Sequence, residues 1–154
     1  MLFAWQQMGQ IMIKCSEPTI SDIREAISYS RKDVYCSEEL TEKNIIGNPW
    51  VISMRGPDNS LGAIVGLDII HKGVAYGWAV TTQNLRCFPL AYTKKMEVVV
   101  NEAMNYFELH RLQIIVKCRS DLIRWAEHLG FIIEGKMIQY GTDKSDYYIM
   151  GRTR

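Results

Sequence analysis

A strand pattern, an amphipathic helix and a second strand pattern follow one another between residues 74 and 118, and this succession constrains the fold most. The first strand pattern, VAYGWAVT, covers residues 74–81, and the second, RLQIIVKC, covers residues 111–118. Between them, apolar residues recur at helical spacing from Tyr92 to Phe107. Two strands joined through a helix lie parallel in one sheet, with a right-handed crossover. The continuous apolar centre of the second strand predicts burial on both of its faces.

Antiparallel strands are predicted on both sides of this crossover. Segments rich in β-branched and aromatic residues are separated by Asp, Asn and Gly turn residues, a pattern typical of hairpins. Three such strands are expected over residues 49–56, 61–71 and 74–81, and a terminal hairpin over residues 131–150. A further short strand is expected within residues 11–17. Parallel and antiparallel neighbours together predict a mixed sheet.

Helices are predicted at three further places, each after a polar capping residue and two of them before a terminating glycine. They are residues 18–31 with Thr19 or Ser21 as cap, 37–47 between Ser37 and Gly47, and 120–131 between Ser120 and Gly130. The predicted element order is β-α-α-β-β-β-α-β-α-β-β, an α/β fold in one domain. This domain is expected over residues 11–154, with an N-terminal extension over residues 1–10.

Charge and the spacing of cysteine and histidine exclude several classes of function. Lys and Arg number 18 and Asp and Glu 17, with the two signs interspersed, so non-specific binding to nucleic acid is not expected. The four cysteines and three histidines are scattered, so neither a metal site nor a disulfide framework is expected. Free thiols fit a reducing cytosol. No apolar run reaches the length of a membrane span.

The run IRWAEHLGFIIEGKMIQY, residues 123–140, resembles the helix–Gly-Phe–strand signature of the GNAT N-acyltransferase superfamily. Within that superfamily it is similar to the branch that acetylates protein amino termini, and AIVG at residues 63–66 is similar to the middle-strand pattern. The segment 77–95 is also similar to a GNAT-like family of short-tailed bacteriophages, some of whose members are internal virion proteins. The resemblance covers about residues 11–150 and implies the GNAT fold.

The segment RCFPLA, residues 86–91, lies where the GNAT pattern Arg/Gln-x-x-Gly-x-Gly/Ala joins the fourth strand to the third helix. The resemblance implies that this loop holds the pyrophosphate of acetyl-CoA with backbone N–H groups and the helix N-terminus. Arg86 and Ala91 match the pattern, but Pro89 replaces the first glycine and has no N–H to donate. The alternative is that Pro89 only starts a helix and Arg86 is solvated.

The expected cofactor site extends beyond this loop. The backbone amides expected to remain available to the pyrophosphate are those of Phe88, Leu90, Ala91 and Tyr92. Lys94 and Lys95 are expected nearby. The full set that the resemblance assigns to acetyl-CoA is Ala79, Val80, Thr81, Arg86, Cys87, Phe88, Pro89, Leu90, Ala91, Tyr92, Arg119 and Trp125.

Catalytic residues are harder to assign from the resemblance. Arg119 occupies the position of a family asparagine, and a surface ion pair is its alternative role. Ala126, beside Trp125, replaces a family tyrosine that acts as general acid. The candidate general bases are Asp68 and Glu134, although such a residue is more often a solvated strand-edge carboxylate. A backbone N–H near residues 79–81 is expected to polarise the thioester carbonyl.

Two functions follow from these residues. The first is an acetyl-CoA-dependent N-acetyltransferase acting on a protein or a small-molecule amine. The second is an inactive GNAT-fold phage protein in the host cytoplasm or the virion, with structural or host proteins as partners, because Pro89, Arg119 and Ala126 all depart from the catalytic pattern. A CoA-binding regulator without turnover lies between them, and the oligomeric state, monomer or homo-oligomer, is left open.

Overall fold

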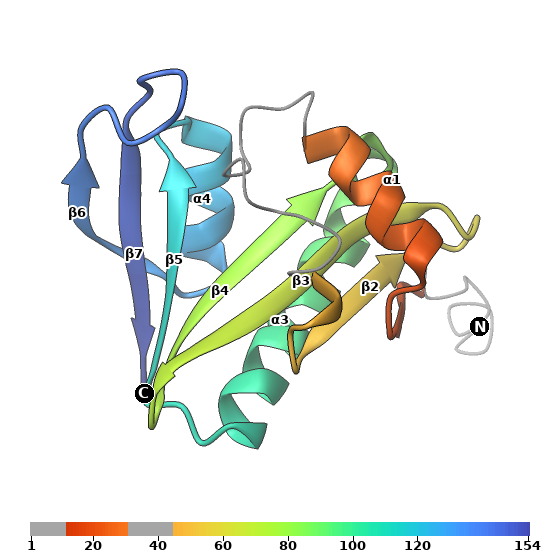
Figure 1. The fold of residues 1–154 in the computed structure, drawn as a ribbon, viewed down its shortest axis with the longest axis horizontal. Helices are drawn as coiled ribbons and strands as arrows, with labels where there is room; N and C mark the ends of the chain where they lie inside the picture. The colour runs from red at the N-terminus through yellow and green to blue at the C-terminus, as the bar shows by residue number, and fades with distance from the viewer. Residues whose placement is uncertain (1–11, 31–44) are drawn as a thin grey trace, which may run out of the picture.

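The computed structural model describes residues 12–30 and 45–154 and arranges them as one seven-stranded sheet with helices on both faces (Figure 1). The strands lie in the order β1-β2-β3-β4-β5-β7-β6. Their bounds are β1 Lys14–Ser16, β2 Val51–Arg55, β3 Leu61–His71, β4 Val74–Thr81, β5 Arg111–Lys117, β6 Ile132–Met137 and β7 Tyr147–Thr153. The helices are α1 Ile20–Ser30, the short 3₁₀ helix η1 Gln83–Cys87, α3 Pro89–Tyr106 and α4 Ser120–His128.

The predicted mixed α/β fold is confirmed by the pairing of these strands. Strands β1 to β4 pair antiparallel in chain order, and β6 and β7 form the terminal hairpin. Strand β5 pairs parallel with β4 and antiparallel with β7. The parallel step is the one that α3 connects, as the crossover pattern in the sequence requires.

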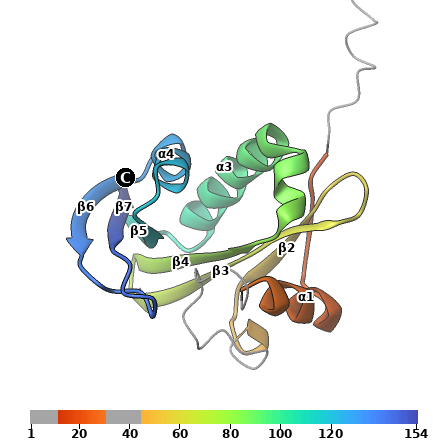
Figure 2. The same ribbon diagram turned by 90° about the horizontal axis from the view of Figure 1, so that it is seen from above.

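The two faces of the sheet carry different helices, with α3 and α4 on one side and α1 on the other (Figure 2). The apolar stripe predicted for the long helix is confirmed. Phe107 packs against this stripe, whose six buried residues are Tyr92, Met96, Val99, Val100, Ala103 and Met104. A smaller core lies beneath α1 and consists of Ile23, Ala26, Ile45, Leu61, Ile64 and Val80. The face of β5 opposite α4 is outside both cores.

The prediction that β5 is buried on both faces is wrong. Leu112 is its one buried residue, and the other six are half-buried. Because α1 packs on β3 and β4, the face of β5 turned away from α4 has polar contacts instead. Arg111 pairs with Glu134 there, and Lys117 pairs with Asp143.

The predicted helix ends are confirmed in two cases and wrong in one. Thr19 caps α1, since its Oγ1 accepts the N–H of Asp22 at 3.1 Å. Gly130 follows α4 with φ +89°, the left-handed conformation expected of a terminating glycine. Ser120 does not cap α4, because it is the first helical residue and Arg119 precedes it without a side-chain cap.

Two predictions fall largely outside the described residues. The extension at residues 1–10 lies outside them, as do residues 37–44 of the predicted second helix. Of that helix, residues 45 and 46 are described and helical, and a turn follows at Gly47. Within residues 12–30 and 45–154, no helix has both the length and the apolar character needed to span a membrane.

Candidate functional site

Strands β4 and β5 separate partway along their length and leave an opening in the sheet. Their parallel pairing is confined to Val74–Tyr76 against Arg111–Gln113, although β4 continues to Thr81 and β5 to Lys117. Figure 1 shows the two strands diverging beyond this point. The last parallel pair, Tyr76 with Gln113, marks the apex of the opening. Beyond it, the facing edge of each strand is free of the other strand.

The backbone of β4 presents alternate residues to this opening. The N–H of Thr82 donates to the carbonyl of Gly62 at 2.9 Å, and Ala63 lies opposite Thr81 in the β3–β4 register. Because hydrogen-bonded pairs alternate along an antiparallel ladder, the N–H groups of Ala79 and Thr81 point away from β3 and into the opening. The N–H of Val80 points toward β3 instead, and its side chain lies in the core beneath α1. The structure therefore brings two of the three predicted β4 residues to the opening.

The segment between β4 and α3 is wound into the short helix η1, and its predicted site residues lie mostly at the surface. The Thr82 hydroxyl accepts the N–H of Asn84 at 3.2 Å and donates to the carbonyl of Leu61 at 2.5 Å, which fixes the start of the turn. Arg86 and Cys87 are exposed. Arg86 thus places a cation close to the start of α3.

Fewer backbone amides are free at the start of α3 than the sequence pattern predicts. The N–H of Phe88 donates to the carbonyl of Leu85 at 3.3 Å, and that of Tyr92 donates to Phe88 at 3.0 Å. Pro89 is the first helical residue and has no N–H. Leu90 and Ala91 remain, since the first turn of a helix has no internal acceptor for its amides. The four predicted donors are reduced to two.

The side chain of Tyr92 was not anticipated as a structural element of this site. Its ring lies against Gly62, where an added Cβ would come within 2.2 Å of the ring, so only glycine fits there. Gly62 is the extra residue of a β-bulge, because Met54 pairs with Ala63 and Arg55 with Leu61. Tyr92 is 1% exposed. The glycine-containing bulge fixes the height of the first turn of α3 above the sheet.

The hydroxyl of Tyr92 is buried and has no hydrogen-bond partner among the described residues. Burial, reinforced by the charge of Asp58, raises the pKa of this phenol to about 12. The hydroxyl is therefore neutral at physiological pH. This unpartnered hydroxyl lies beside Gly56 and Gly62, beneath the start of α3.

Trp125 connects α4 to the same turn. Its Nε1–H donates to Oγ1 of Thr93 at 3.0 Å, and Thr93 in turn donates to the carbonyl of Pro89 at 2.8 Å. Trp125, predicted from the resemblance as a cofactor contact, thus joins α4 to the first turn of α3. Ala126, at the family tyrosine position, is 2% exposed and belongs to the core.

The remaining candidates form local ion pairs or hydrogen bonds. The guanidinium of Arg119 donates to both carboxylate oxygens of Asp121, at 2.6 and 2.7 Å, which is the surface ion pair given as the alternative. Glu134 accepts two hydrogen bonds from Arg111, and these bonds lower the pKa of its carboxyl. Asp68 is exposed and accepts a hydrogen bond from Nδ2 of Asn48 at 2.6 Å.

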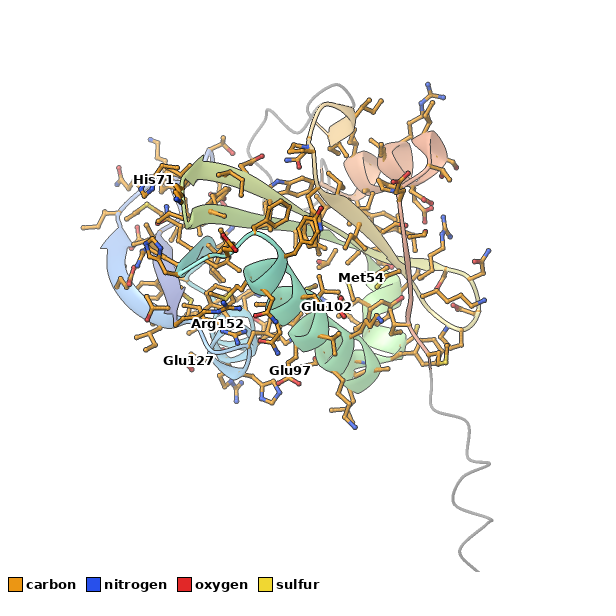
Figure 3. The ribbon with its side chains drawn as sticks, turned by 90° about the horizontal axis from the view of Figure 1, so that it is seen from below. Met54, His71, Glu97, Glu102, Glu127 and Arg152 are labelled. Carbon is orange, nitrogen blue, oxygen red and sulfur yellow. The ribbon has the colours of Figure 1, made fainter. Side chains whose placement is uncertain are left out.

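A polar hollow of about 280 Å³ lies elsewhere, between α3 and the end of α4. It is lined by Glu97, Asn101, His128, Leu129, Gly130 and Arg152. Arg152 donates to Oδ1 of Asn101 at 2.5 Å and to the carbonyl of Leu129 at 3.1 Å, so it joins the two helices. Figure 3 shows Glu97 and Arg152 close together on the side of the sheet that α3 covers. The hollow is distinct from the opening between β4 and β5.

These features fit acetyl-CoA in part. The N-terminus of an 18-residue helix attracts a diphosphate, and Leu90 and Ala91 offer amides to it. The free edge of β4 offers hydrogen bonds to an extended chain that contains amide groups. Pro89 leaves one backbone donor fewer at the start of α3. No group of three or more His, Cys, Asp or Glu in the described part of the chain could hold a metal ion.

Comparison with solved structures identifies the fold. Neither a family model nor a curated protein sequence matches this chain. The spermidine N-acetyltransferase SpeG of Vibrio cholerae, in a chimera with hSSAT, is similar with a TM-score of 0.75 and 14% identity, covering 92% of this chain and 95% of that chain. Ard1 from Thermoplasma volcanium has a TM-score of 0.76 and 15% identity, with coverage of 93% and 98%.

A third solved structure leads to the same conclusion. The GNAT-family acetyltransferase of Bacillus anthracis has a TM-score of 0.69 and 14% identity, covering 93% of this chain and 97% of that chain. In all three comparisons the match extends over nearly the whole of both chains, so the likeness concerns the complete domain rather than a shared motif. The chain has the fold of the GNAT acetyltransferases.

Proposed function

We propose that this protein binds acetyl-CoA in the opening between β4 and β5 and transfers the acetyl group to an amine. The observation that carries the proposal is the combination of a free β4 edge with the start of α3 at one end of the opening. Leu90 and Ala91 would hold the diphosphate through their N–H groups, and Arg86 would add a positive charge. Ala79 and Thr81 would bind the pantetheine arm through their backbone groups.

The chemistry of the proposed reaction needs little from charged side chains. Bound in the opening, acetyl-CoA supplies an acetyl group activated as a thioester. The N–H groups along the edge of β4 can stabilise negative charge on a carbonyl oxygen. Glu134 is a poor base because Arg111 occupies both of its oxygens. Asp68 lies on β3, one strand away from the opening, so it is a candidate for binding the amine substrate rather than for deprotonating it.

The loop containing Pro89 is a weakened version of the phosphate loop in this proposal. A hydrogen bond to a charged acceptor contributes about 1.5–3 kcal/mol, or about one to two decades of affinity. Binding of acetyl-CoA is therefore expected to be weak but measurable. The competing proposal is a GNAT-fold phage protein without turnover. The buried Ala126 and the Arg119–Asp121 ion pair favour the absence of turnover. The protein's stoichiometric presence in purified virions would support that alternative.

Calorimetric titration with acetyl-CoA tests the proposal on the wild type, Pro89→Gly and Pro18→Gly. We expect Pro89→Gly to bind acetyl-CoA about 10- to 100-fold more tightly than the wild type, because a backbone donor is restored. Pro18→Gly, before α1, should bind like the wild type. If neither the wild type nor Pro89→Gly binds at millimolar concentration, the opening is not an acetyl-CoA site.

A further inference from the structure

Three polar residues form a row across the sheet at the apex of the opening. Asp68 on β3 lies opposite Tyr76 on β4, and Tyr76 lies opposite Gln113 on β5 in the last parallel pair. The neighbouring residues on the three strands, Leu67, Ala75 and Leu112, belong to the core beneath α3 and α4. Because side chains alternate along a strand, Asp68, Tyr76 and Gln113 face the opposite side of the sheet. We name these three residues the apex row.

Asp68 carries the negative charge of the apex row, and no cation among the described residues pairs with it. The described strands contain two carboxylates, Asp68 and Glu134. The charge of Glu134 is balanced by Arg111, which donates two hydrogen bonds to it. None of the described ion pairs includes Asp68, whose described hydrogen-bond partner is the neutral amide of Asn48 at 2.6 Å. Asn48 thus orients the carboxylate without reducing its charge.

The distance from Asp68 to the opening decides what this carboxylate can bind. Asp68 is on β3, whereas the opening lies on the far side of β4, so about one strand spacing, ~5 Å, separates the two. A nitrogen that reaches the opening is therefore beyond hydrogen-bond distance of the carboxylate. A second nitrogen on the same molecule, joined to the first through roughly three or four methylene groups, spans a separation of about one strand spacing.

Trp78 supplies an apolar wall beside Asp68. It is the next residue of β4 on the same face as Tyr76, and it lies opposite Gly66. Its ring covers Gly66, where an added Cβ would come within 2.1 Å of the ring. The side chain is half-buried, so part of it contacts solvent. A methylene chain can pack on such a ring, and a nearby cation is attracted to its face.

We propose that the acceptor is a small diamine or polyamine that binds on the sheet face opposite α3. Its second, positively charged nitrogen pairs with Asp68, its methylene chain crosses β4 over Tyr76 and beside Trp78, and its reacting nitrogen reaches the apex of the opening. This inference rests on the proposed acetyl transfer. Charge complementarity and the spacing from β3 to the opening favour a dication over a neutral peptide or a monoamine.

Equilibrium binding of putrescine and of n-butylamine, measured calorimetrically in the presence of CoA, tests this inference without turnover. The two probes share a four-carbon chain and differ in the second amino group. The variants are Asp68→Asn, which keeps an oxygen to accept from Asn48 and removes the charge, and Glu102→Gln, which removes an exposed carboxylate on α3. Acetyl-CoA binding and thermal unfolding are measured on the same samples.

We expect putrescine to bind the wild type and Glu102→Gln at least tenfold more tightly than n-butylamine, and Asp68→Asn to bind both probes equally. Acetyl-CoA should bind Asp68→Asn and wild type alike. Equal affinity of the wild type for both probes, or a preference that persists in Asp68→Asn, would overturn the inference. Preferential binding of a peptide with a free amino terminus would overturn it in favour of a protein acceptor. Loss of acetyl-CoA binding in the wild type would instead contradict the proposed function.

Discussion

The starts of α1 and α3 satisfy their backbone donors in opposite ways. At α1, Thr19 and Asp22 form a reciprocal cap, in which the Asp22 carboxylate also accepts the N–H of Thr19 at 2.8 Å. Asp22 is 1% exposed and pairs with Arg55. At α3, Phe88 precedes the helix without a side-chain cap, and Pro89 removes one donor. The start of α1 is closed by its own side chains, and that of α3 is left for water or a ligand.

This difference separates a structural helix start from a candidate binding one. At α1 the cap engages the N–H of Asp22, and the buried carboxylate of Asp22 repels an external anion. The uncapped start of α3 gains its position instead from packing, through Tyr92 on Gly62 and Trp125 on Thr93. Substitutions at the two starts should therefore affect stability through different interactions.

The largest effect is expected from Asp22→Ala at the start of α1. The change removes the cap and leaves Arg55 without its buried partner, which costs about 3 kcal/mol of unfolding free energy. Urea denaturation measures it. Asp121→Ala, which breaks the exposed pair with Arg119, should cost less than about 1 kcal/mol. Similar losses in the two variants would show that the closed start of α1 has no special role.

Gly62→Ala should destabilise the protein through the start of α3. The new methyl group would overlap the ring of Tyr92 and force α3 or the bulge to shift, at a cost of about 2 kcal/mol. Gly135→Ala is the matched control, because its Cβ would meet Ile149 at an ordinary contact distance of 3.4 Å. Equal unfolding midpoints for the two variants would contradict the close packing described for Tyr92.

Trp125→Phe should cost about 1 kcal/mol, since it removes the hydrogen bond to Thr93 and some packing. Thr93→Val removes the same bond from the other side, together with the bond from Thr93 to the carbonyl of Pro89. In a double-mutant cycle the two losses should not add, because each variant breaks the same interaction. Strict additivity of the unfolding free energies would mean that this hydrogen bond does not hold α4 to the start of α3.

Tyr92→Phe should have the smallest effect near neutral pH, because it removes a buried hydroxyl that has no partner. Its effect lies in the pH dependence. The pKa of Tyr92 is about 12 in the folded protein, above the usual value of about 10, so the folded state retains the proton longer. Wild-type stability should fall as the pH rises through this window, and Tyr92→Phe should lose this component. Denaturation at a series of alkaline pH values compares the two.

Most of the fold could be predicted from local patterns in the sequence. The stripe from Tyr92 to Met104 indicated α3, and the β-α-β succession indicated its parallel crossover. The burial of β5 was predicted wrongly, because its apolar run does not reveal that α1 stops short of β5. Serine is a preferred N-cap residue, and on this basis Ser120 is predicted to precede α4. In the structure the helix already includes Ser120, and Arg119 holds the cap position.

The candidate site could be located from the sequence but not described. RCFPLA indicated the loop, and Pro89 indicated the missing donor. The engagement of the Phe88 and Tyr92 amides could not be predicted, because it depends on how η1 and α3 wind. The apex row could not be predicted either, since Asp68, Tyr76 and Gln113 belong to three strands whose register is set by the whole sheet.

Local sequence patterns are sufficient to predict the order of the described elements, the long apolar face of α3 and the missing N–H at Pro89, because each depends on neighbouring residues in the chain. Only the folded chain shows where β4 and β5 part, which amides stay free at the start of α3, and which strand carboxylate pairs with an arginine. These properties depend on strand register and on ion pairs between residues far apart in sequence, such as Arg111 with Glu134.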